Sequence, residues 1–353
     1  MELKSYFLGA NTPYGFYSLF SELYNPEKDN TIYLIKGGPG TGKSSIMKKI
    51  ASYAEKKGLS VERIPCSSDP LSLDAIIIPE LKVAMADATS PHIINPVYPG
   101  VCEHTVELSQ CWKKDKLKIN TSVIKKITKE NSLAHKKCIR FMKAAAVVNE
   151  EIKEILSSVY DIEKIKRFTA RLINTEIKDS EKGECRSIFL SAVTPLGIVV
   201  QYDTLFSSDR ILTINDKYGY ASELIMNELN NYSELNNIAR TNCLCPMNPE
   251  KKIDHILFGN GFSVFSADIY HPMIKKGYRT VHTERFLIKD KYDKVKNRIT
   301  FLNKTKLELI GEAVKSLEEA KALHDILESY YIAAMDFSKV SEITDSLIKE
   351  IFG

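Results

Sequence analysis

The sequence has few cysteines, one tryptophan and no long apolar run, and its charges nearly cancel. Its seven cysteines are an odd number spread thinly over 353 residues, which is typical of reduced thiols in a cytosol and not of a disulfide framework. The longest apolar stretches are far shorter than the roughly 18 to 20 residues needed to cross a bilayer, and residues 1–8 lack the apolar segment of a signal peptide. We therefore expect a soluble, cytoplasmic protein with no membrane span.

The overall charge excludes a chain that binds nucleic acid with its whole surface. Lysine and arginine number 49 against 45 acidic residues, a formal charge of +4. Cys243 and Cys245 form a C-x-C pair, but no second cysteine or histidine cluster follows at zinc-ligand spacing, which favours structural thiols over a metal site. The length, with 44% hydrophobic and 27% charged residues, indicates a globular protein of two domains.

An internal repeat organises the chain. Segments in the first half recur 179 to 182 positions later in the same order, which predicts two copies of one domain. A polar, turn-rich segment at 178–183 places the boundary near residue 182. The repeated segments are 4–8 and 186–190, 12–15 and 194–197, 32–35 and 211–214, and 46–47 and 225–226.

The first copy carries a glycine-rich motif between a predicted strand at 31–35 and a predicted helix at 43–57. Its residues 37–44 match G-x-x-x-x-G-K-[ST], the P-loop pattern, in which backbone N–H groups and the helix N-terminus converge on phosphate oxygens. We predict that ATP and Mg²⁺ bind here; a turn that binds nothing is the other interpretation. The predicted nucleotide-binding residues are Gly37, Gly38, Pro39, Gly40, Thr41, Gly42, Lys43, Ser44 and Ser45.

These residues resemble the P-loop NTPase superfamily, and the loop is most similar to those of ATPases and nucleotide kinases. The wider pattern, with Thr12-Pro13 before the strand, an Asp-x-Thr-x-Pro-His element at 87–92 and two tandem copies, is similar to a family of uncharacterised tandem P-loop ATP-binding proteins of bacteria. The resemblance implies ATP as the ligand, and no guanine-specific N-K-x-D element is present. It brings no established substrate.

The motif and the repeat together predict an α/β protein with two tandem three-layer domains of the P-loop NTPase type. The first domain spans 1–182 and has a long helical arm at about 117–173. The second domain, a degenerate copy, spans 183–353 and has its arm at about 292–350, so the chain would form an intramolecular pseudo-dimer.

A P-loop site needs an acid that orients Mg²⁺, and Asp87 follows a predicted apolar strand. Ser44 and Asp87 are therefore the predicted metal ligands, and Lys43, Asp87 and His92 the predicted catalytic residues. Asp87 could instead cap the strand end, and His92 could make a structural hydrogen bond. ATPases of the AAA type place a catalytic glutamate after this aspartate, whereas Ala88 stands here, which argues against rapid hydrolysis.

Further residues could complete the site. Asp69 and Asp74 follow the second predicted strand, where an acceptor or base could lie, although either could cap a turn. A duplicated chain could also supply an arginine finger from its second half, and no feature selects one of the four arginines considered. They are Arg210, Arg240, Arg279 and Arg285.

The second copy has lost the motif. Its corresponding residues 216–223 keep one glycine, Ser222 replaces Lys43 and Glu223 replaces Ser44. Asp216 also replaces Gly37, so two carboxylates would face a phosphate in place of a lysine and a hydroxyl, which disfavours Mg-nucleotide binding. We therefore predict one nucleotide per chain and a pseudo-NTPase second domain that acts as a scaffold or regulator.

The first arm is strongly basic. Residues 113–143 carry 11 basic and two acidic side chains, a net charge of +9, which could bind nucleic acid or an acidic protein, or close on a phosphate as a lid. A solvated helical face is the other interpretation. The main functional hypothesis is an ATP-binding protein with weak or partner-stimulated hydrolysis. A nucleotide-kinase-like phosphotransferase and a nucleic-acid-associated ATPase are the alternatives.

Overall fold

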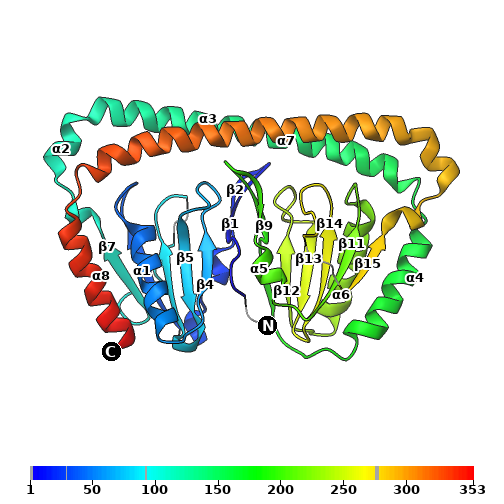
Figure 1. Ribbon diagram of the computed structural model, residues 1–353, viewed down its shortest axis with the longest axis horizontal. Helices are drawn as coiled ribbons and strands as arrows, with labels where there is room; N and C mark the ends of the chain where they lie inside the picture. Colours follow the sequence, from blue (N-terminus) through cyan, green and yellow to red (C-terminus); the bar gives the residue numbers. More distant parts are fainter. Residues whose placement is uncertain (1–2, 29, 92–93, 275–277) are drawn as a thin grey trace.

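The computed structural model is a mixed α/β protein in which two sheets stand side by side beneath two long antiparallel helices (Figure 1). The long helices are α3 (Thr121–Ser157) and α7 (Lys289–Ile332). The structure describes residues 3–28, 30–91, 94–274 and 278–353. Within those ranges, no helix is both long enough and apolar enough to pass through a membrane.

The first sheet has five strands in the order β4-β5-β6-β3-β7. Strand β3 lies second from the edge and is parallel to both neighbours, β6 and β7, whereas β5 runs antiparallel to β4 and β6. The apolar side of helix α1, including Ile46 and Ile50, packs on one face of the sheet. The predicted strand 31–35 and helix 43–57 are both present. The elements are β3 (Thr31–Lys36), α1 (Lys43–Lys56), β4 (Glu62–Pro65), β5 (Leu73–Ile78), β6 (Val83–Asp87) and β7 (Glu103–Glu107).

The second sheet has the same strand order and directions, β12-β13-β14-β11-β15, with β8 added beside β12. Strands β3 and β11 therefore occupy corresponding places, and helix α6 corresponds to α1. The elements are β8 (Cys185–Ile188), β11 (Arg210–Asn215), α6 (Tyr220–Leu235), β12 (Arg240–Leu244), β13 (Ile253–Phe258), β14 (Phe262–Ala267) and β15 (Arg279–His282).

A central layer of hairpins separates the two sheets. Phe7 and Phe189 exchange backbone hydrogen bonds of 2.8 and 2.9 Å, and their buried rings lie in one apolar cluster with side chains of both sheets. Helices thus cover the outer face of each sheet, whereas this layer replaces the helices that a three-layer domain would have on the inner face. Its elements are β1 (Gly9–Thr12), β2 (Gly15–Ser18), η1 (Phe20–Glu22), β9 (Ser191–Thr194), β10 (Gly197–Val200) and α5 (Tyr202–Leu205).

The helical arms fall in the predicted ranges, but each reaches the other half of the chain. Helix α3 runs across to the second sheet, where α4 (Ile162–Leu172) packs on α6. Helix α7 returns to the first sheet, where α8 (Phe337–Phe352) packs on α1 (Figure 1). Backbone bridges between Trp112 and Met335 and between Tyr160 and Leu287 join the arms at opposite ends of the long helix pair. The outer face of each sheet is therefore covered in part by a helix from the other half of the chain, α8 on the first sheet and α4 on the second.

Candidate functional site

The P-loop joins the end of β3 to the first turn of α1. Gly40 and Gly42 have φ angles of +63° and +93°, in the left-handed region that favours glycine. A Cβ atom on Gly40 would also lie 2.8 Å from Ile332 Cγ1 of α7. Glycine is thus needed at position 40 for the backbone conformation and for the close approach of the second arm.

Lys43 is folded over the loop that precedes it. Its Nζ donates hydrogen bonds to the carbonyl oxygens of Gly37 (2.9 Å) and Gly38 (2.8 Å) and lies 3.5 Å from Asp87 Oδ2. Asp87 reaches this position because β6 pairs directly with β3, and its other oxygen accepts a hydrogen bond from the Thr89 N–H (2.9 Å). The lysine and the acid that the sequence singled out are therefore neighbours, and both side chains are largely buried.

Two oxygen groups of the kind that Mg²⁺ prefers lie next to Lys43. One is the carboxylate of Asp87, and the other is the hydroxyl of Ser44, whose Oγ accepts a hydrogen bond from the Leu73 N–H (2.9 Å). Ser45, one residue further into α1, is exposed. These groups suit a cation held together with phosphate oxygens. Across the described ranges, no cluster of three or more histidine, cysteine or acidic side chains is suited to hold a metal on its own, and all seven cysteines are free thiols.

Residues of the second arm cover the P-loop, and no sequence pattern points to them. Glu328 Oε1 accepts a hydrogen bond from the Gly40 N–H (3.0 Å) and lies 3.5 Å from His324 Nε2. The hydrogen bond from His324 lowers the pKa of Glu328, with help from Gly40, although burial opposes the shift. In sequence, Glu328 is one of many acids on a long amphipathic helix. Only the path of α7 over the first sheet brings it to the loop.

Aromatic side chains from both halves also contact the loop. A Cβ atom on Gly38 would lie 3.1 Å from Trp112 Cζ2 and 3.3 Å from Tyr331 Cε1, and the two rings lie 5.8 Å apart. Trp112 is the only tryptophan in the chain. Its fluorescence would therefore report on the P-loop alone.

Asp69 and Asp74, the two acids that follow the second predicted strand, differ from each other in their contacts. Asp69 accepts a hydrogen bond from the Ser72 hydroxyl (2.8 Å), and its Oδ2 lies 3.8 Å from Lys321 Nζ of α7. Asp74 is buried in β5, directly after the residue that contacts Ser44. His92 lies outside the described residues.

The four arginines make their contacts around the second sheet, with partners from both halves of the chain. Arg210 pairs with Glu176 (2.6 Å), and Arg240 donates to Asn230 Oδ1 (2.9 Å). Arg279 and Arg285 lie over the rings of Phe168 and Phe286. The second half does reach the P-loop, but it does so with the carboxylate of Glu328.

The corresponding loop of the second half is closed by its own carboxylate. Asp216 is fully buried, and its oxygens accept hydrogen bonds from the N–H groups of Ser222 (2.7 Å) and Tyr218 (3.3 Å) and from the Thr283 hydroxyl (3.2 Å). Glu223 instead pairs with Lys153 of α3 at 2.9 Å. A carboxylate of the loop itself thus accepts the hydrogen bonds of the loop N–H groups.

The basic segment 113–143 forms α2 (Lys114–Ile119) and the first part of α3, and all eleven of its basic side chains are exposed. Lys137 lies 3.5 Å from Glu319 of α7. Exposure fits both a binding surface and a solvated helical face.

Comparison with known proteins adds no relative: no protein-family model, curated protein or solved structure matches the chain.

Proposed function

We propose that the first half binds Mg-ATP at the P-loop and hydrolyses it weakly or only when a partner stimulates it. One observation carries this proposal. The loop between β3 and α1 places the Lys43 ammonium 3.5 Å from the Asp87 carboxylate, at the N-terminus of a helix. In this proposal the chain is a pair of P-loop-type domains. The second is a degenerate copy that binds no nucleotide.

ATP and α7 would compete for the same groups of the loop. The Gly40 N–H now donates to Glu328, and Lys43 to two loop carbonyls. A triphosphate would need both donors, so its binding would move Lys43 and displace the carboxylate of Glu328. Because α7 crosses to the second sheet, this displacement would transmit the nucleotide state across the molecule. The proposed role is thus a nucleotide-dependent switch.

Two features support slow hydrolysis. Ala88, which follows Asp87, is buried and apolar, so it offers no base at the position used by AAA-type ATPases. Asp69, a candidate base for the phosphotransferase alternative, is already engaged by Ser72 and Lys321. The geometry therefore favours a switch over a phosphotransferase. The nucleic-acid-associated ATPase rests on the exposed basic segment alone and predicts turnover that nucleic acid stimulates in a salt-dependent way.

A calorimetric titration with Mg²⁺ and a non-hydrolysable ATP analogue, followed in parallel by Trp112 fluorescence, tests the proposal. We expect one site per chain, a change in the tryptophan emission, and loss of both signals in Lys43→Ala. Two sites would contradict the inactive second copy. An absence of binding would contradict the proposed function.

A further inference from the structure

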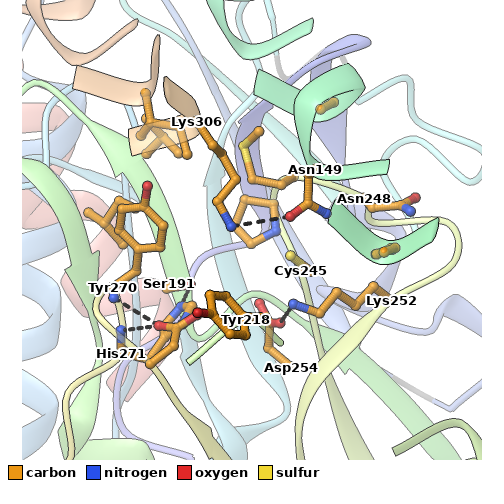
Figure 2. Close-up of a pocket in the computed structure, with 18 of the residues that line it drawn as sticks. Asn149, Ser191, Tyr218, Cys245, Asn248, Lys252, Asp254, Tyr270, His271 and Lys306 are labelled. Carbon is orange, nitrogen blue, oxygen red and sulfur yellow. Dashed lines mark hydrogen bonds and ion pairs between the residues drawn. The ribbon is translucent and has the colours of Figure 1, made fainter. Parts of the chain in front are cut away.

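The second half contains a pocket that the proposed function does not use. It lies between the second sheet and the two long helices, on the side of the loop 216–223 (Figure 2). Its volume is about 70 Å³, whereas one water needs about 10 to 15 Å³ on the same measure. The pocket therefore has room for a small ligand.

Most charged side chains that line this pocket are already paired. These groups therefore already have a partner at hydrogen-bond or ion-pair distance inside the cavity. Glu150, at the rim, lies 3.4 Å from Lys153. The pairs are Lys252 with Asp254 (2.9 Å), His271 with Asp268 (3.2 Å) and Lys153 with Glu223 (2.9 Å).

Lys306 is the exception. It descends from α7 into the pocket, and its Nζ donates a hydrogen bond to Asn149 Oδ1 (3.2 Å) (Figure 2). No carboxylate among the described residues lies within 4.0 Å of this ammonium. Burial, with the nearby charge of Lys252, lowers its pKa to about 8. This cation therefore has no carboxylate at ion-pair distance, although the charges of Asp268 and Asp216 oppose the fall in its pKa.

Two further polar atoms are buried without a partner in the described structure, the Tyr270 hydroxyl and Asp254 Oδ2. Both residues line the pocket beside Lys306. The free groups are thus an ammonium and a hydroxyl that donate, and one oxygen that accepts. A hydrogen phosphate or a protonated phosphate ester matches this set, because it accepts several hydrogen bonds, carries negative charge and donates one O–H.

We propose that this pocket binds a phosphate group, free or on a small molecule, with Lys306 as its counter-charge, Tyr270 as a donor and Asp254 as the acceptor of its O–H. The ligand would contact α7 and, through Asn149, α3. It would therefore bind the same two helices whose ends cover the loops of both halves. This inference does not depend on nucleotide binding at the P-loop.

The experiment is a calorimetric titration with inorganic phosphate, carried out in a Lys43→Ala background so that phosphate at the P-loop does not contribute. We expect saturable binding that weakens about tenfold or more in Lys306→Met and about threefold or more in Tyr270→Phe, because a charged and a neutral hydrogen bond are lost. Lys304→Met, which removes an exposed lysine of the same helix, is the matched control and should leave the affinity unchanged.

Three results would overturn the inference: no saturable binding at millimolar phosphate, binding that Lys306→Met leaves intact, or equal weakening in Lys304→Met. Methyl phosphate in the same assay distinguishes the two ligand sources. Tighter binding than that of phosphate assigns the site to a phosphate ester, and weaker binding assigns it to the free anion.

A pH series with inorganic phosphate between about pH 7.5 and 9.5, a range in which the ligand stays hydrogen phosphate and keeps its O–H, provides a second readout if Lys306→Met fails to fold. Phosphate affinity should fall as the pH rises through about 8, where Lys306 loses its charge. Of the other groups that face it, Lys252, Asp254, Asp268 and Lys153 are ion-paired, and burial raises the pKa of Cys245 to about 12. The Asp268 carboxylate raises the pKa of His271 although burial opposes it, so the series is repeated in His271→Gln. The fall near pH 8 should persist there, and its loss would overturn the role of Lys306.

Discussion

The two corresponding loops satisfy their backbone N–H groups with carboxylates of different origin. In the first half, the Gly40 N–H donates to Glu328, which belongs to an arm that starts over the other sheet. In the second half, the N–H groups of Tyr218 and Ser222 donate to Asp216 of the same loop. An anion at such N–H groups is what a bound phosphate supplies. A loop capped by a distant residue can exchange that anion for a ligand, whereas a loop capped from within cannot.

The contacts between loops and arms also have opposite polarity. In the first half the loop is the donor, through the Gly40 N–H, and Glu328 of the arm is the acceptor. In the second half the loop carries Glu223 and the arm carries Lys153, which pair at 2.9 Å. Opposite charges therefore meet at this contact of the second half, and Asp216 accepts the N–H groups of its loop.

The largest expected effect comes from removing the cation of the first loop. Lys43→Ala should weaken Mg-ATP binding about 100-fold or more, because a charged donor to the phosphates is lost, a change of about 3 kcal/mol. Calorimetry and Trp112 fluorescence measure it. Lys217→Ala, at an exposed position of the second loop, is the control and should bind ATP normally. Equal losses in both variants would remove the functional difference between the loops.

Removing the buried carboxylate of the second loop should lower the stability of the folded protein. Asp216→Ala leaves the buried N–H groups of Tyr218 and Ser222 without an acceptor, so we expect the free energy of unfolding to fall by about 2 to 3 kcal/mol. Urea unfolding followed by circular dichroism measures it, and Lys217→Ala should change the same quantity by less than about 0.5 kcal/mol. An unchanged free energy of unfolding in Asp216→Ala would mean that water replaces this carboxylate at little cost.

The sequence predicts the local parts of both loops well. The P-loop, its strand and its helix follow from short-range patterns, and Asp87 beside Lys43 follows from the pairing of neighbouring parallel strands. Glu328 could not be predicted, because amphipathic spacing shows that a helix has an apolar face but not which sheet receives it. The same holds for Lys306, whose significance depends on the pairing of every other charge in its pocket. The residues that sequence patterns do not predict are thus those brought to a site by contacts between segments far apart in the chain.

A smaller effect is expected where the arm covers the first loop. Glu328→Gln keeps the shape of the side chain but removes a negative charge that would face the phosphates, so ATP should bind about tenfold more tightly, or about 1.4 kcal/mol. Glu308→Gln, an exposed acid of the same helix, is the control and should not alter the affinity. Unchanged affinity with a loss of turnover in Glu328→Gln would contradict competition and make Glu328 part of the hydrolytic machinery.

The smallest effect is expected where the arm contacts the second loop, at the ion pair between Lys153 of α3 and Glu223. Lys153 and Glu223 are 15% and 17% exposed, so their pair is partly shielded from water, and a double-mutant cycle with Lys153→Met and Glu223→Gln should give a coupling of about 1 kcal/mol in the free energy of unfolding. Lys153→Met should be less stable than the double variant, because it leaves Glu223 without its partner, whereas in Glu223→Gln the Lys153 ammonium keeps Glu150 at 3.4 Å. Lys153→Met should also change the ATP affinity at the P-loop slightly, because the proposed switch requires α3 and α7 to couple the two loops. Unchanged ATP affinity in all three variants would mean that the arm contacts act independently and would contradict the switch.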